Sequence, residues 1–89
     1  MSAWHVAWTA TGRRSLALLP EQVGTAAIEF AYGPLADNPR RVGKPLRFEF
    51  EGFQVARRGD YRVIYSIDDT THRVVIHLIE HRANAYRRR

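Results

Sequence analysis

The sequence contains no cysteine and only one lysine, and it has no long hydrophobic run. The lack of cysteine excludes disulfide frameworks, thiolate nucleophiles and cysteine-based zinc sites, so that four histidines are the soft metal ligands available. No stretch approaches the roughly 18 to 20 apolar residues that span a bilayer, and the N-terminus lacks a basic start followed by an apolar segment. We therefore expect a soluble, cytoplasmic protein with no membrane association.

Length and charge narrow the class of protein further. A chain of 89 residues buries only about 60 to 65% of the surface that its unfolded form exposes, which allows one modest core and a single domain, residues 1–89. Of the 14 basic residues all but Lys44 are arginine, and the formal net charge is +5. Because arginine favours bidentate contacts to phosphate, we expect a polyanionic partner.

The first half of the chain predicts a strand followed by two helices. Residues 4–8 alternate as a short strand does, and the hydroxyl of Thr9 can cap a helix that runs to about residue 19. Pro20 suits the first turn of a second helix, where its missing N–H would have no partner in any case. The apolar stripe that follows has helical spacing, and Gly33-Pro34 is expected to end or kink this helix.

The second half predicts an antiparallel ladder of strands. Three segments alternate in polarity and are joined by glycine turns: residues 46–50, 53–57 and 61–67. Arg62 then lies on the face opposite the large apolar side chains of its strand. The next apolar run, residues 73–79, is typical of a central strand covered on both faces, and His77 is expected to be a core histidine within it.

The element order βααββββ predicts an α+β fold. Two N-terminal helices would pack on one face of a mostly antiparallel sheet of four to five strands, and a short C-terminal helix or tail would follow. The other face of the sheet would stay partly open, and an open face is where we expect the functional site.

Several short motifs, taken together, carry a family resemblance. The most specific is the run Arg57-Arg58-Gly59-Asp60-Tyr61-Arg62-Val63-Ile64-Tyr65, which is followed by an Asp-rich turn, by His81-Arg82 and by Tyr86. Gly43-Lys44-Pro45-Leu46, Gly52-Phe53 and the joint Leu19-Pro20 also match. These motifs cover nearly the whole chain and resemble the RelE/ParE superfamily of bacterial toxins.

The resemblance implies the toxin of a type II toxin–antitoxin pair. In the RelE branch the toxin cuts mRNA in the ribosomal A site without a metal or other cofactor, and a small RelB-like antitoxin wraps it in a hetero-oligomer. Cleavage of RNA by its own 2′-hydroxyl requires that this hydroxyl lose its proton, that the phosphorane charge be stabilised, and that the 5′ oxygen gain a proton. Arginine, lysine, histidine and tyrosine can together supply these functions.

The resemblance also implies roles for individual residues. Arg62 matches the strand arginine that contacts the scissile phosphate, and His81 matches an acid or phosphate contact with Arg82 beside it. Tyr86 matches a tyrosine that stacks on a base or orients the 2′-hydroxyl, although it could equally close the small core. Further RNA contacts are expected from four basic residues: Lys44, Arg47, Arg57 and Arg58.

The general base is left unassigned by the resemblance. The well-studied RelE branch has two lysines on the strand before the Gly-x-Tyr-Arg turn, where this sequence has Gln54 and Ala56. Another branch uses a glutamate near residues 43–45, and none is present there. The remaining candidates are Lys44, His81 and Glu49.

Two other functions stay open from the sequence. A ParE-like member would inhibit DNA gyrase, and a catalytically weakened member would bind RNA or antitoxin without cleaving. The ending His81-Arg82-Ala83-Asn84-Ala85-Tyr86 favours the RelE branch, because ParE members usually lack the terminal tyrosine. Without the resemblance, Arg62 would be read as a strand arginine paired with Glu49 or Asp60.

Overall fold

The computed structural model describes residues 3–82 and gives five strands and two helices in the expected order. The helices are α1 (Ala10–Ala17) and α2 (Glu21–Phe30). The strands are β1 (His5–Trp8), β2 (Lys44–Pro45), β3 (Phe53–Arg58), β4 (Tyr61–Asp68) and β5 (Arg73–His81). A π-helical turn, η1 (Ala31–Leu35), and a 3₁₀ turn, η2 (Phe48–Phe50), complete the elements. The predicted C-terminal helix or tail lies outside the described residues.

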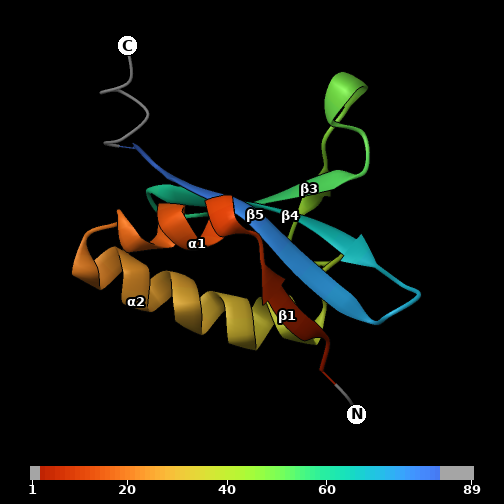
Figure 1. Ribbon diagram of the computed structural model, residues 1–89, viewed down its shortest axis with the longest axis horizontal. Coiled ribbons are helices and arrows are strands. Elements are labelled where there is room, and N and C mark those ends of the chain that lie inside the picture. Colours follow the sequence, from red (N-terminus) through yellow and green to blue (C-terminus); the bar gives the residue numbers. More distant parts are fainter. Residues whose placement is uncertain (1–2, 83–89) are drawn as a thin grey trace.

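The strands form one mixed sheet in the order β1-β5-β4-β3-β2. Only the pair of β1 and β5 is parallel, and the other three pairs are antiparallel. Figure 1 shows α1 and α2 together on one side of this sheet, and no helix of the described residues covers the other side. The predicted α+β architecture with one open sheet face is therefore confirmed.

The core lies between the helices and the covered face of the sheet. Helix α2 contributes the buried Ala27 and Phe30, and α1 packs the half-buried Leu16 against the core. Strand β4 contributes Val63 and Tyr65, which are 1% and 0% exposed. Arg62 directly precedes Val63 in β4 and faces the open side, as its strand alternation predicted. No helix within residues 3–82 is long and apolar enough to cross a membrane.

Both helix starts follow from the local sequence. The Thr9 hydroxyl accepts a hydrogen bond of 2.9 Å from the N–H of Gly12, and so it caps α1 as predicted. Pro20 occupies the cap position of α2. At its other end, α2 gives way after Phe30 to the wider π-helical turn η1, which contains Gly33 and Pro34, the pair predicted to end or kink this helix.

A β-bulge in β5 changes the pairing of the sheet midway along the strand. Tyr65 lies opposite Ile76, but the next residue of β4, Ile64, lies opposite Leu78. His77 is therefore one extra residue on β5, and every position after it moves to the other face. The two buried side chains on either side of the bulge, Ile76 and Ile79, are three positions apart instead of two.

Helix α1 contacts the backbone at this bulge. The N–H of Thr9 donates to the Ile76 carbonyl at 3.0 Å, and the N–H of Ile79 donates to the Ser15 hydroxyl at 2.9 Å. An ideal Cβ on Gly12 would lie 2.4 Å from the Ile76 carbonyl oxygen, so only glycine allows the helix to approach this closely. Strand β1 pairs with β5 only as far as Ile76. At and beyond this point, Thr9 and Ser15 supply hydrogen-bond partners to the backbone of β5.

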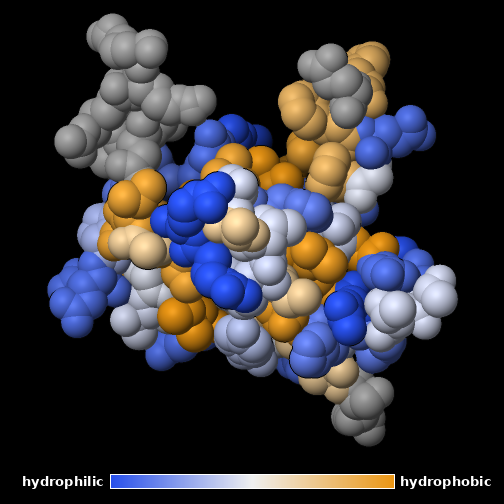
Figure 2. All heavy atoms as spheres, in the orientation of Figure 1, coloured by the Kyte–Doolittle hydropathy of each residue, from blue (hydrophilic) through white to orange (hydrophobic). Residues whose placement is uncertain are grey.

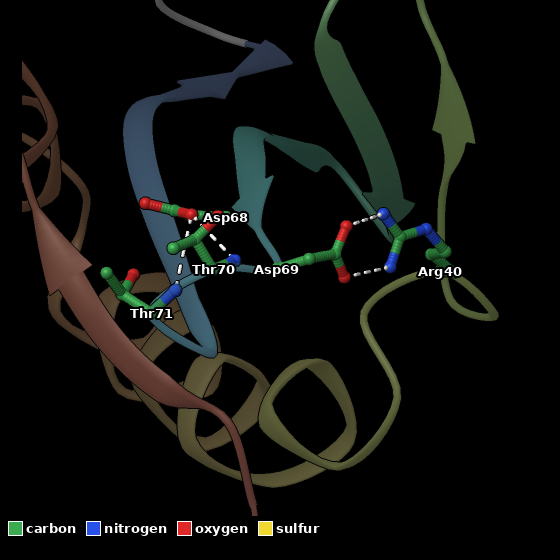
Figure 3. Close-up of polar contacts among 5 residues, drawn as sticks. All are labelled: Arg40, Asp68, Asp69, Thr70 and Thr71. Carbon is green, nitrogen blue, oxygen red and sulfur yellow. Dashed lines mark hydrogen bonds and ion pairs between the residues drawn. The ribbon is translucent and has the colours of Figure 1, made fainter.

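The loop after η1 is fixed to the sheet at two points. The buried Tyr65 hydroxyl donates to the Pro39 carbonyl at 2.6 Å, and burial raises the pKa of this phenol to about 12. Arg40 makes two hydrogen bonds to Asp69, of 3.0 and 2.8 Å, which hold the pKa of that carboxyl below its usual value (Figure 3). Asp68 accepts from the N–H groups of Thr70 and Thr71 in the same turn.

The prediction of a strand over residues 46–50 is wrong. Lys44 lies opposite Val55, so in the same register residues 47–52 have no partner except each other and must form the hairpin loop. The last ladder bond runs from the Leu46 N–H to the Phe53 carbonyl, and Phe48 then adopts a φ of 62°. The loop projects beyond β3 in Figure 1, and Figure 2 shows apolar side chains gathered on it.

The two expectations for the last strand are also wrong. Within residues 3–82, helices cover β5 on one face only, and His77 is a half-buried residue of the open face. The ring nitrogen Nε2 of His77 lies 2.9 Å from the Ser66 hydroxyl, and Phe53 packs edge-on against the ring. The bulge accounts for the apolar run of this strand. It places Ile76 and Ile79 in the core, three positions apart, and leaves His77 and Leu78 between them.

We predict that Gly12→Ala destabilises the protein. The added methyl group collides with the Ile76 carbonyl, and overpacking of this kind costs about 1 to 3 kcal/mol. Urea unfolding measures the change. Gly24→Ala is the matched control, because its nearest neighbour is 4.0 Å away and alanine favours a helix by about 0.5 to 1 kcal/mol. Equal effects of the two substitutions would contradict the close approach at Gly12.

We also predict that His77 makes stability depend on pH. Desolvation lowers the pKa of His77 in the folded protein below the ordinary histidine pKa of about 6.5. As the pH falls through this range, the unfolded chain therefore binds this proton more readily than the folded protein does. The free energy of unfolding should therefore fall as the pH is lowered from about 7.5 to 5.5. His77→Gln should reduce this slope in urea titrations at several pH values. Equal slopes for His77→Gln and the parent protein would refute this assignment.

Candidate functional site

Three charged side chains form a row across the open face of the sheet. The register pairs Arg57 of β3 with Arg62 of β4, and it pairs Arg62 with Glu80 of β5. Like charges directly opposite each other on neighbouring strands repel. The row therefore carries one more positive than negative charge, and an anion on the open face would stabilise it.

Arg62 and Glu80 form a partly buried ion pair. The Nε of Arg62 donates to Oε1 of Glu80 at 2.7 Å, and Nη2 also contacts that oxygen at 2.5 Å. The side chains are 41% and 24% exposed. The pair fixes the plane of the guanidinium and leaves part of it accessible from the open face.

A hollow of about 360 Å³ adjoins this pair, where the β3–β4 turn meets the end of β5. Its lining combines the charged row with the residues that follow it in the turn and in β5. The lining residues are Arg57, Gly59, Asp60, Tyr61, Arg62, Glu80, His81 and Arg82. The hollow thus brings together three of the four residues for which the sequence predicted catalytic roles. The fourth, Tyr86, lies outside the described residues.

His81 and Arg82 reach the hollow from the end of β5. The Nδ1 atom of His81 is buried and has no hydrogen-bond partner within residues 3–82. Opposite it lies Tyr61, whose pKa is raised by burial, so its phenol is protonated at neutral pH. The N–H of Arg82 donates to the Asp60 carbonyl at 2.8 Å, which ties this end of β5 to the β3–β4 turn.

A second hollow, of about 250 Å³, lies between the strand β3 and the segment that leads into β2. The described residues that line it include four cations and no carboxylate, together with Val42, Gly43 and Val55. The cations are Arg41, Lys44, Arg57 and Arg58. Arg57 belongs to both hollows, so the two form one continuous positive surface. Such a surface attracts a chain of negative charges.

The remaining basic residues predicted to contact RNA have different positions. The guanidinium of Arg58 stacks over the Phe30 ring of α2, with Cζ 4.5 Å from the ring centre. Arg47 precedes η2 in the projecting loop and lines neither hollow. Lys44, a candidate general base from the sequence, lines the second hollow and not the one that contains Arg62.

Glu80 is the residue of this site that the sequence did not indicate. Simple strand pairing from the Asp68–Arg73 turn would place Ile79 opposite Arg62, and only the extra residue at His77 moves Glu80 there. A glutamate directly before His81 was the available signal, but its face could not be assigned without the bulge.

Comparison with known proteins bears on this site. Residues 8–86 match the sequence model of the family described as "ParE toxin of type II toxin-antitoxin system, parDE". A protein named Toxin RelE from Mycobacterium tuberculosis is 56% identical over 84 residues, which is 94% of this chain and 87% of that relative. Toxin RelG of the same organism is 52% identical over 85 residues, 96% of this chain and 98% of that relative.

Solved structures agree with the sequence comparison. A chain of the M. tuberculosis toxin–antitoxin complex RelBE2 superposes with a TM-score of 0.90 at 49% identity, over 93% of this chain and 95% of that chain. The isolated Escherichia coli RelE toxin shares the fold, with a TM-score of 0.61 at 14% identity over 89% and 84% of the two chains. The chain therefore belongs to the RelE/ParE superfamily and is a toxin of a type II toxin–antitoxin system, as its motifs predicted.

Proposed function

We propose that this toxin is an endoribonuclease that cleaves mRNA bound in the ribosomal A site and thereby inhibits translation. The observation that carries the proposal is the row of Arg57, Arg62 and Glu80 on the open sheet face, next to the hollow that also contains His81 and Arg82. The names of the similar RelE and RelG toxins support the same branch of the superfamily.

In this proposal Arg62 stabilises the transition state. Attack of a ribose 2′-hydroxyl on the adjacent phosphate produces a phosphorane with additional negative charge. The guanidinium of Arg62 is already oriented by Glu80, so it binds that charge with little further loss of side-chain freedom. Arg82 and Arg57 line the same hollow and contact the same or a neighbouring phosphate.

His81 is the proposed acid that protonates the departing 5′ oxygen. Imidazole gains and loses a proton near neutral pH, which suits this role. Tyr86 is proposed to stack on a base beside the scissile bond, a contact that contributes roughly 1 to 3 kcal/mol per base. None of these steps uses a metal or other cofactor.

The second hollow is the proposed path for the neighbouring part of the RNA strand. Its lining within the described part of the chain has positive charge from Lys44, Arg41 and Arg57 and no carboxylate, which favours a phosphate backbone of any sequence. Arg58 lines the same hollow, and Arg47 adds to this field from the projecting loop. Binding should therefore weaken as the salt concentration rises.

A cognate antitoxin is the proposed protein partner, in a hetero-oligomer with this toxin. The similar structure from M. tuberculosis is a toxin–antitoxin complex, as are RelB–RelE structures from Pyrococcus horikoshii and E. coli. The net charge of +5 favours an acidic segment that covers the arginine surface. Ribosomal mRNA as substrate would place the free toxin in the cytoplasm.

Inhibition of DNA gyrase is a second candidate function. The description of the matched family names ParE, and fold alone does not separate the two activities. A supercoiling assay with purified gyrase distinguishes them, since a nuclease of translated mRNA should leave supercoiling unchanged.

We predict that expression of the toxin without its antitoxin produces new 5′ ends within translated messages, and that Arg62→Ala removes them. Loss of one preorganised charge contact lowers such rates by about 10² to 10³-fold. Primer extension on induced cultures measures the cuts.

Arg40→Ala is the matched control for this experiment. It also removes an arginine, but one whose ion pair with Asp69 lies at the opposite end of β4 from the hollow, so the cuts should persist. Cuts that survive Arg62→Ala combined with His81→Gln would refute the site assignment. Growth arrest without cuts would favour gyrase, and no arrest would favour a toxin that only binds.

A further inference from the structure

Glu80 binds Arg62 through only one of its two carboxylate oxygens. Oε1 receives the hydrogen bond from Nε and the contact from Nη2. No hydrogen bond from residues 3–82 reaches Oε2 of Glu80 or uses Nη1 of Arg62. Both groups are partly exposed, so each has an atom available to a bound molecule.

The planar shape of the Arg62 guanidinium decides how these two available atoms lie relative to each other. Its N–H groups lie in one plane, and the edge formed by Nε and Nη2 is occupied by Glu80. The neighbouring edge, formed by Nη1 and Nη2, can bind two phosphate oxygens. A carboxylate and a phosphate on adjacent edges of one guanidinium are close enough for the carboxylate to reach a hydroxyl next to that phosphate.

We propose that Glu80 is the general base of the cleavage reaction, an inference that rests on the function proposed above. Oε2 of Glu80 takes the proton of the ribose 2′-hydroxyl as the 2′ oxygen forms a bond to phosphorus. The bond from phosphorus to the 5′ oxygen breaks, and that oxygen takes a proton from the acid. The products are a 2′,3′-cyclic phosphate and a 5′-hydroxyl, and no metal or water enters the step.

Two of the other candidate bases, Lys44 and His81, are less well placed. Lys44 lines the second hollow, apart from Arg62. His81 is the neighbour of Glu80 in β5 and is paired with Tyr61, so it approaches the hollow from the other side of the strand. The attacking and departing oxygens lie on opposite sides of the phosphorus, so the reaction requires two proton-transfer groups that reach it from different directions.

The test is single-turnover cleavage of mRNA on programmed ribosomes by the full-length toxin and its Glu80→Gln variant. We expect the rate to fall by about 10² to 10⁴-fold. The parent rate should rise with pH on the acid side of its profile, and this rise should disappear in Glu80→Gln. Glu80→Asp should be slower than the parent but keep the rise, because it retains the carboxylate. Glu29→Gln, at an exposed position of α2, should match the parent.

A modified substrate separates a base from a residue that only positions Arg62 or protonates the leaving group. Sulfur in place of the 5′ bridging oxygen makes protonation of the leaving group unnecessary. This substrate should leave Glu80→Gln slow, because removal of the 2′ proton is still required. Thermal unfolding of both Glu80 variants checks that they fold. If Glu80→Gln does not fold, Glu80→Asp still tests the proposal.

Several results would overturn the role of Glu80. These are a Glu80→Gln rate equal to or above that of the parent, an unchanged pH profile, or full rescue by the sulfur substrate. A faster variant would mean that Glu80 competes with phosphate for Arg62. Absence of cleavage by the parent toxin would instead refute the proposed function itself.

Discussion

The extra residue at His77 in β5 is the constraint on which the rest of this structure depends. It moves the second half of the strand by one position, so that Ile79 enters the core and Glu80 faces Arg62. A bulge leaves backbone groups without ladder partners, and helix α1 supplies them through Thr9 and Ser15. The same feature therefore positions the first helix on the covered face and the charged pair on the open face.

The charged site is confined to the part of the sheet that no described helix covers. Arg57 and Arg62 lie side by side on neighbouring strands, and Glu80 offsets only one of the two charges. Burial of this row in the core would cost far more than the ion pair returns. On the open face the excess charge can be offset by an anionic ligand, and the second hollow continues the same positive surface.

Local sequence was sufficient wherever one element decides its own structure. The cap at Thr9, the start of α2 at Pro20 and the orientation of Arg62 follow from propensity and alternation, and the structure confirms them. The prediction failed for residues 46–50, because the hairpin register is set by the pairing of Lys44 with Val55 and not by alternation within the segment. It failed for His77 because an apolar run does not show a bulge.

The sequence by itself determined the family, the α+β class and the arginine-rich motif, since these depend on residue order and on short-range periodicity. Only the tertiary structure decided that Arg62 pairs with Glu80, 18 residues further along the chain, and that His81 and Arg82 meet them at one hollow. The physical reason is that pairing between strands depends on register. One inserted residue changes every later partner and leaves the composition of the strand unchanged.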